Sequence, residues 1–181
     1  MRISKPLLLT LLVIAFAAAA WVQQAATATK PAPAPDANGI RWYSYQEGWE
    51  KAKAEKKHMF VDFTATWCGW CKRLEQTTFA EPQVSKGLND DFVPVKVWEL
   101  STDTVVIEGY KISERDLARR EFRVRGYPSL WFVSPRGVRI GPAGGYVDAG
   151  TFLKYLDIVK YYRYDTTLDE NGNPKAKTDN K

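Results

Sequence analysis

The two cysteines of this 181-residue chain are separated by only two residues, in the segment Trp67-Cys68-Gly69-Trp70-Cys71. The segment before it, Met59 to Thr64, is apolar and contains aromatic and β-branched residues, which predicts a buried strand. The segment after it, Cys71 to Gln76, consists mostly of good helix formers. The cysteines therefore lie where a strand is followed by a helix, and this arrangement limits the folds open to the chain more than any other feature.

This position suits thiol chemistry, because a helix N-terminus stabilises a nearby anion. A free thiol has a pKa of about 8.5 and is therefore mostly protonated at neutral pH. Only the deprotonated form, the thiolate, is a good nucleophile. Unpaired backbone N–H groups and the helix dipole favour the thiolate of a cysteine in the first turn, which here is Cys68. Cys71 returns to the same face about one turn later. We therefore expect a redox-active disulfide with an accessible, low-pKa Cys68 and a shielded Cys71.

Three other uses of such a pair fit the sequence less well. A zinc site needs about four ligands, and the chain offers two cysteines and one histidine, His58, which we expect at the surface. Covalent haem attachment needs a histidine directly after the second cysteine, where this chain has Lys72. A purely structural disulfide would close a very small loop and would constrain the unfolded chain little. The pattern thus predicts a redox-active pair without a metal or another cofactor.

The N-terminus has the pattern of a secretory signal. Arg2 and Lys5 precede an apolar run from Pro6 to Val22, and small residues up to Ala28 offer a cleavage site. We interpret residues 1–28 as a signal peptide, with an uncleaved membrane anchor as the alternative, since the run is at the short end for a spanning helix. Either interpretation places the domain outside the cytoplasm, where disulfides persist, and we expect a bacterial periplasm.

The rest of the chain predicts one domain between a linker and a tail. Residues 29–39 are rich in proline and alanine, which predicts an extended linker. Loss of residues 1–28 would lower the formal net charge from +5 to +3, and no basic cluster with interleaved aromatic residues indicates nucleic-acid binding. Residues 40–163 are enough for one domain with its own core. The polar segment 164–181 predicts a disordered tail.

Hydrophobic periodicity and capping residues predict helices and strands in alternation within this domain. The predicted strands are 41–43, 58–64, 92–98, 129–134 and 138–140. The predicted helices, three of them capped by Ser44, Ser113 and Asp148, are 44–56, 68–78, 81–89, 113–122 and 151–162. Segment 101–112 is polar and irregular, with a small hairpin around Glu108 as one interpretation, and 141–145 is expected to be flexible. This order predicts an α/β fold in which a central mixed sheet is flanked by helices on both faces.

Three segments carry a resemblance to a known family. Phe60 to Lys72, with the sequence FVDFTATWCGWCK, resembles the signature of the thioredoxin superfamily. Gly126-Tyr127-Pro128-Ser129-Leu130 is similar to its cis-proline segment, and Gly144-Gly145-Tyr146 is similar to its C-terminal glycine region. The resemblance spans about Arg41 to Tyr162 and is closest to exported thioredoxin-like proteins, including sulfur-oxidation-associated thioredoxins and the soluble end domains of membrane electron-relay reductases. It implies a thioredoxin-like fold.

The resemblance also implies a role for individual residues. Cys68 matches the attacking cysteine and Cys71 matches the resolving cysteine. Asp62 matches a buried acid that helps to deprotonate the resolving thiol, and Lys96 matches a lysine that pairs with this acid. Pro128 matches a proline with a cis peptide bond that lies against the disulfide and aligns the substrate backbone.

The residues that the resemblance places at the substrate-binding surface include the main departures from the family pattern. These residues are Trp67, which shelters the site, and Gly69, Trp70 and Tyr127. Gly69-Trp70 replaces the usual Gly-Pro between the cysteines, and this pair tunes the reduction potential. Tyr127 is bulkier than the usual residue before the proline, and segment 101–112 is longer than in a minimal thioredoxin. Because of these departures, the resemblance does not specify the reduction potential or the substrate. It still implies the class of reaction.

The resemblance implies an exported thiol–disulfide oxidoreductase that acts on the disulfides of other proteins, and we favour the reducing direction. Such a protein needs a membrane or soluble dithiol as electron donor and no cofactor. We expect a monomer that binds no nucleic acid. A disulfide oxidase or isomerase, and a thioredoxin-fold binding module whose disulfide is idle, stay open as alternatives.

Overall fold

The computed structural model describes residues 31–107, 109–169 and 172–173. Among these, the residues from Pro33 onward belong to one compact unit. The predicted signal peptide, residues 1–28, lies outside the described residues. The same is true of Glu108 and of the end of the predicted tail, residues 174–181.

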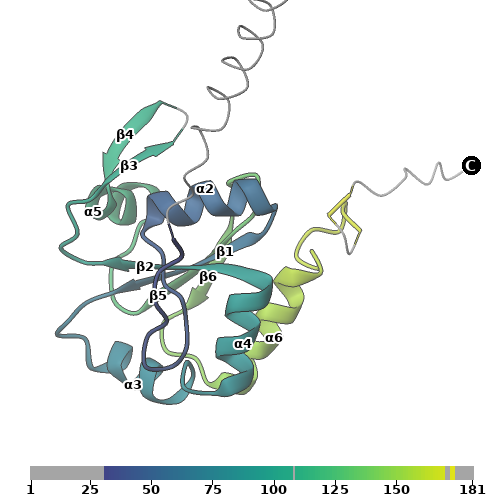
Figure 1. Ribbon diagram of the computed structural model, residues 1–181, viewed down its shortest axis with the longest axis horizontal. Helices are drawn as coiled ribbons and strands as arrows, with labels where there is room; N and C mark the ends of the chain where they lie inside the picture. The colour runs from purple at the N-terminus through teal and green to yellow at the C-terminus, as the bar shows by residue number, and fades with distance from the viewer. Residues whose placement is uncertain (1–30, 108, 170–171, 174–181) are drawn as a thin grey trace, which may run out of the picture. The chain divides into compact units, whose positions relative to one another are not determined.

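A four-stranded mixed sheet forms the centre of this unit (Figure 1). β1 (His58–Thr64) is buried along its whole length and lies between β2 (Phe92–Trp98), which runs parallel to it, and β5 (Ser129–Val133), which runs antiparallel. β6 (Arg139–Gly144) pairs antiparallel with β5 at the edge of the sheet. The predicted mixed α/β sheet is confirmed, and the apolar run before the cysteines is its central strand.

Helices cover both faces of the sheet (Figure 1). One face packs against α2 (Tyr45–Glu55) and against the short segments α5 (Glu114–Asp116) and η2 (Leu117–Glu121). The helices on the other face are α3 (Gly69–Thr77), α4 (Pro82–Asp91) and α6 (Ala149–Lys160). Side chains of a strand alternate between the two faces, so Met59 of β1 packs towards α2, whereas Phe60 packs towards α4 and α6.

Three helices begin at the predicted capping residues. Ser44 accepts a hydrogen bond from the Glu47 backbone N–H, and the Glu47 side chain accepts one from the Ser44 N–H, which completes a capping box at α2. Ser113 caps α5 and Asp148 caps α6 through their side-chain oxygens. The single helix predicted for 113–122 is in fact a short α-helical turn, α5, that continues as the π-helix η2.

The segment between β2 and α5 forms a hairpin that adds to the core. β3 (Thr104–Ile107) pairs antiparallel with β4 (Tyr110–Ser113) in a separate two-stranded sheet, which confirms the hairpin interpretation for segment 101–112. Val105 and Ile112 belong to the buried hydrophobic cluster that also contains Trp49 and Ala52 of α2. The segment is therefore ordered and apolar on its inner side, although its composition is polar.

The edge strand β6 is longer than predicted. The sequence predicts a flexible segment at residues 141–145, but residues 141–144 belong to β6, which pairs with β5 up to Gly144. The register between β5 and β6 shifts twice, and Gly141 and Gly144 adopt the positive φ angles of 134° and 90°. Glycine allows this conformation without a steric cost, so the glycines accommodate an irregular strand rather than a loop.

His58 is buried, and the prediction of a surface position is wrong. Only 4% of the residue is exposed, because the chain after α6 folds over it. Its Nε2 atom lies 2.8 Å from the Tyr164 hydroxyl, and its ring centroid lies 4.5 Å from that of Tyr162. Burial lowers the pKa of His58 from 6.5 to about 4. Leu168 is buried as well, so the chain makes defined contacts beyond residue 164, where its composition predicts disorder.

Candidate active site

Cys68 and Cys71 form a disulfide at the N-terminus of α3. Cys68 is the N-cap residue of the helix, and its Sγ atom accepts the backbone N–H of Cys71 at 3.0 Å. The two Cα atoms are 5.3 Å apart. The N–H group that faces the Cys68 sulfur is one of the unpaired donors of a helix N-terminus, and such donors favour a thiolate over a thiol.

The predicted contrast between an accessible Cys68 and a shielded Cys71 is absent from this disulfide form. Each cysteine residue is 4% exposed. Ala65 and the two cysteines form a small buried cluster, and the Tyr127 side chain packs against it. The burial of Cys68 therefore comes from its neighbours on the β1–α3 connection and on the segment before β5.

Exposed aromatic side chains border the disulfide. Trp67 and Trp70 are 67% and 59% exposed, although both belong to the Cys-x-x-Cys segment. The Trp67 ring meets the edge of the Tyr127 ring at a centroid distance of 6.0 Å, and its Nε1–H donates to Glu99 Oε2 at 2.6 Å. The Trp70 ring lies 5.3 Å from that of Tyr146. Large exposed aromatic residues are typical of surfaces that bind other proteins.

The peptide bond between Tyr127 and Pro128 is cis, as the sequence resemblance predicts. Pro128 is buried and directly precedes β5. In the antiparallel register, Ser129 of β5 is opposite Phe63 of β1. The register thus places Pro128 at the end of the sheet where β1 leads into the cysteine segment.

Asp62 is a buried acid on β1, on the face of the sheet that α3 covers. The residue is 1% exposed. Its Oδ1 atom has no hydrogen-bond partner, the only such buried side-chain atom within residues 31–107, 109–169 and 172–173. Burial raises the pKa of Asp62 from 3.8 to about 7; the positive charge of Lys96 opposes this rise, and the negative charge of Glu75 adds to it.

Lys96 forms its ion pair with Glu75 rather than with Asp62. Asp62 and Lys96 are opposite each other in the register of β1 and β2. The Lys96 Nζ atom nevertheless bonds Glu75 Oε1 of α3 at 2.9 Å and lies 4.4 Å from the centre of the Trp42 ring. The pairing of Lys96 with Asp62 that the resemblance implies is therefore replaced by a longer-range attraction, and the ion pair of Lys96 is made with Glu75.

The chain before α2 helps to hold this arrangement. The Trp42 Nε1–H donates to Asp36 Oδ2 at 2.7 Å, and the Asn38 side chain donates to the backbone carbonyl of Glu75 at 3.0 Å. Ile40 is completely buried. Residues 36–40 thus pack against the domain through specific contacts, where the proline- and alanine-rich composition predicts an extended linker.

Three residues of the site were not identified from the sequence. Glu75 had a usable signal, because it lies four positions after Cys71 and therefore on the same side of the predicted helix. Glu99 and Tyr146 had none, since each reaches its tryptophan only through the folding of segments far apart in the chain. Of the residues that the resemblance places at the substrate-binding surface, Tyr127 packs against the cysteine cluster, and its ring lies 6.0 Å from that of Trp67.

Comparisons with known proteins agree on the family. Residues 45–160 match the thioredoxin-like domain family. The thiol:disulfide interchange protein DsbD of Pseudomonas fluorescens is 31% identical over 107 residues, which are 58% of this chain and 17% of that protein. The protein disulfide-isomerase of Hordeum vulgare is 33% identical over 89 residues, which are 49% of this chain and 14% of that protein. The chain thus spans less than a fifth of the length of these two relatives.

A solved structure of similar size gives the same result for the fold. A thioredoxin from Thermus thermophilus superposes with a TM-score of 0.54 and is 30% identical. The match covers 66% of this chain and 86% of that protein. The likeness therefore extends over most of a whole protein of the family and is not limited to the cysteine segment.

Proposed function

Because the chain belongs to the thioredoxin-like family, we propose a direction and a location for the chemistry of its Cys68–Cys71 pair. The protein is a thiol–disulfide oxidoreductase. Its proposed role is to reduce disulfides of other proteins outside the cytoplasm, and a dithiol donor then reduces it in turn. Asp62 is the observation that carries the reducing direction.

The first step forms a mixed disulfide. The Cys68 thiolate attacks one sulfur of the substrate disulfide, the substrate S–S bond breaks, and the departing substrate thiolate takes a proton from water. The Cys71 N–H that faces Cys68 Sγ stabilises the attacking thiolate. The exposed rings of Trp67 and Trp70 give the substrate a contact surface beside the attacking sulfur.

The second step releases the reduced substrate. Cys71 loses its proton and attacks the Cys68 sulfur, the mixed disulfide breaks, and the second substrate thiolate leaves and is protonated. Two electrons have then moved from the Cys68–Cys71 dithiol to the substrate. The protein is left as a disulfide, which the donor dithiol must reduce before another turnover.

Asp62 supports this direction because the second step needs a base. A shielded thiol keeps a normal or raised pKa, so Cys71 ionises slowly by itself near neutral pH. Burial raises the pKa of Asp62 to about 7, which suits a group that takes up and returns a proton near neutral pH. Its unpartnered Oδ1 atom leaves a lone pair available for that proton.

The proposed location depends on the N-terminal sequence, where a charged start, an apolar run and small residues have the pattern of a secretory signal. The DsbD relative is named a thiol:disulfide interchange protein, which supports exchange with partner proteins. None of the helices in the described part of the chain is long and apolar enough to cross a membrane.

The reduction potential of the Cys68–Cys71 pair tests the direction. When the protein is equilibrated with glutathione buffers, we expect a reduction potential of about −270 mV, which is typical of a reductant. A potential of about −120 mV is typical of a strong oxidase. The fraction of dithiol can be measured by alkylation and mass shift. A value at the oxidising end would contradict the proposed direction, and a pair that does not exchange at all would contradict the reaction.

A further inference from the structure

A run of unpaired positive charge lies beside the site. Five exposed arginines occur between Glu114 and Pro128: Arg115, Arg119, Arg120, Arg123 and Arg125. The two acids within the run are already paired, Asp116 with Arg120 at 3.6 Å and Glu121 with Arg139 at 3.2 Å. The other four arginines, Arg115, Arg119, Arg123 and Arg125, have no ion pair anywhere in the described part of the chain. We call these four residues the arginine rim.

A buried aromatic residue fixes the segment that carries the rim. Phe122 is almost completely buried, and its ring lies 4.9 Å from that of Phe63 and 5.2 Å from that of Trp131. The Val124 N–H donates to the Ala118 carbonyl at 2.9 Å and closes the turn after η2. Because the backbone is held in this way, the rim presents its charges from a defined surface, and a partner would lose less conformational freedom on binding.

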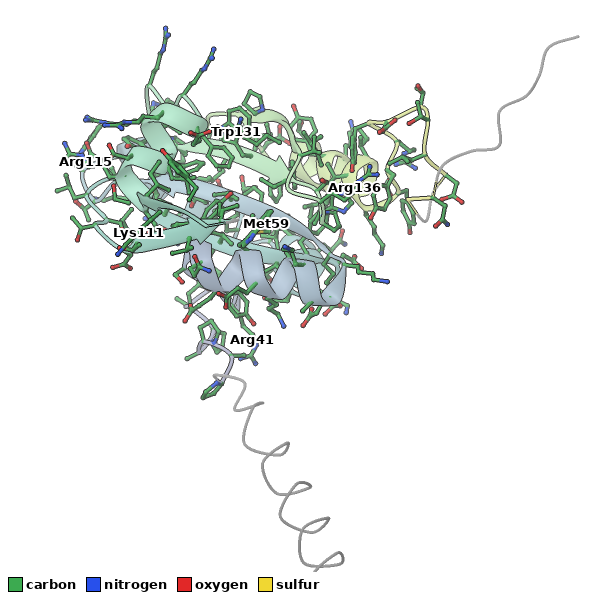
Figure 2. All side chains as sticks on the ribbon, turned by 90° about the horizontal axis from the view of Figure 1, so that it is seen from above. Arg41, Met59, Lys111, Arg115, Trp131 and Arg136 are labelled. Atoms are coloured by element: carbon green, nitrogen blue, oxygen red, sulfur yellow. A yellow bond between two sulfur atoms is a disulfide. The ribbon has the colours of Figure 1, made fainter. Side chains whose placement is uncertain are left out.

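Tyr127 connects the rim to the disulfide. Its side chain packs against the buried cluster formed by Ala65, Cys68 and Cys71. Burial and the negative charge of Glu99 raise the pKa of its phenol, and the positive charges of Arg119 and Arg115 oppose this rise. Arg125 is only two positions before Tyr127, so the rim leads directly to a side chain that packs beside the disulfide. Figure 2 shows Arg115 at the same end of the molecule as Lys111 of β4, and away from Arg136.

We propose that the arginine rim binds an acidic segment of the protein whose disulfide is exchanged at Cys68–Cys71. The proposal rests on the proposed function, because it concerns the substrate of the same site. Four unpaired cations match a short segment with several Asp or Glu residues near the substrate disulfide. Opposite charge placed beside a reactive site mainly raises the association rate and orients the partner. A protein is the favoured occupant over a nucleic acid or a lipid surface, because the charges border a site that reacts with disulfides.

The test compares two disulfide-bonded peptides that differ only in charge. One carries Asp and Glu on both sides of its disulfide, and the other carries Asn and Gln at the same positions. The reduced full-length protein should reduce the acidic peptide roughly tenfold faster at about 20 mM salt, and the difference should shrink at about 300 mM salt. The measurement is the second-order rate constant for each peptide, followed by thiol release.

Two variants with the same loss of charge identify the surface. The rim variant carries Arg115→Gln, Arg119→Gln, Arg123→Gln and Arg125→Gln, and it should lose the preference for the acidic peptide while its rate with the neutral peptide stays within about twofold. The control variant carries Lys53→Gln, Lys56→Gln, Arg136→Gln and Lys154→Gln at exposed positions elsewhere, and it should keep the preference. If the rim variant does not fold, the same rates are measured with the single variant Arg119→Gln. This variant should lose part of the preference for the acidic peptide.

The outcomes separate this proposal from the proposed function. Equal rates with both peptides in the wild type, or an equal loss of preference in the control variant, would overturn the rim proposal alone. So would binding of duplex DNA or phosphatidylglycerol vesicles that depends on the rim when the peptides show no charge preference. A wild-type protein that reduces neither peptide would instead contradict the proposed function.

Discussion

His58 and Asp62 are titratable residues on the same strand and the same face of the sheet, and both are buried. They differ in their hydrogen-bond partners. His58 Nε2 is bonded to the Tyr164 hydroxyl, and the ring also contacts Tyr162 and Phe92. Asp62 Oδ1 has no hydrogen-bond partner among the residues that the structure describes. The chain after α6 provides a hydrogen-bond partner for His58. The described residues provide none for the Oδ1 atom of Asp62.

Burial alone does not qualify a residue for the proton transfer that we propose for Asp62. Burial favours the neutral form of both groups, so it lowers the pKa of His58 to about 4 and raises that of Asp62 to about 7. His58 therefore stays neutral near pH 7 and acts as a packing residue with one hydrogen bond. In the mechanism that we propose, Asp62 exchanges its proton near neutral pH, and its unpartnered Oδ1 atom accepts that proton.

Replacing Asp62 should produce the larger effect on stability. The pKa of the carboxyl is raised on folding, so the native state holds its proton more tightly, and stability falls as the pH rises from 3.8 to about 7. A shift of this size corresponds to about 4 kcal/mol. Relative to the wild type, Asp62→Asn should therefore gain about 4 kcal/mol in free energy of unfolding between about pH 4 and pH 8, measured by urea denaturation of the disulfide form.

A gain of the same size at both pH values would mean that Asp62 does not titrate between them. The variant would then act only by removing a polar side chain from the core. Such a result would break the contrast with His58, because neither residue would change its charge near neutral pH.

Replacing His58 should change the pH dependence of the free energy of unfolding in the opposite direction, and by a somewhat smaller amount. Its pKa is lowered on folding, so its contribution to stability is present above 6.5 and is lost as the pH falls to about 4. Relative to the wild type, His58→Gln should therefore gain about 3 kcal/mol between about pH 7 and pH 4. The same urea denaturation series provides the measurement, and a difference between variant and wild type that does not change with pH would show that His58 is accessible to protons in the native state.

Much of the fold and part of the site could be predicted from the sequence, because these features are local. The apolar run of β1, the helix formers after Cys71 and the caps Ser44 and Asp148 each act within a few residues, so the pattern specifies the element. The cis bond before Pro128 followed from the family resemblance rather than from any local rule.

The rest depends on contacts between segments that are distant in the sequence. His58 is buried by Tyr164, which lies 106 positions away. Lys96 turns to Glu75 because Trp42 and α3 enclose it, and nothing in the β2 sequence indicates that choice. The arginines of the rim were not singled out from the sequence, and their position near the disulfide follows from the packing of Tyr127, two residues after Arg125.

The rate of the second step, followed as a function of pH, tests the central claim most directly. In a single turnover with a model disulfide protein, Asp62→Asn should form the mixed disulfide at the wild-type rate and release reduced substrate roughly 10²-fold more slowly near pH 7. The deficit should shrink towards about pH 9.5, where Cys71 ionises without a base. Asp157→Asn, on the exposed side of α6, is the matched control and should behave as the wild type. Equal release rates for Asp62→Asn and the wild type at every pH would contradict the role of Asp62 and, with it, the proposed reducing function.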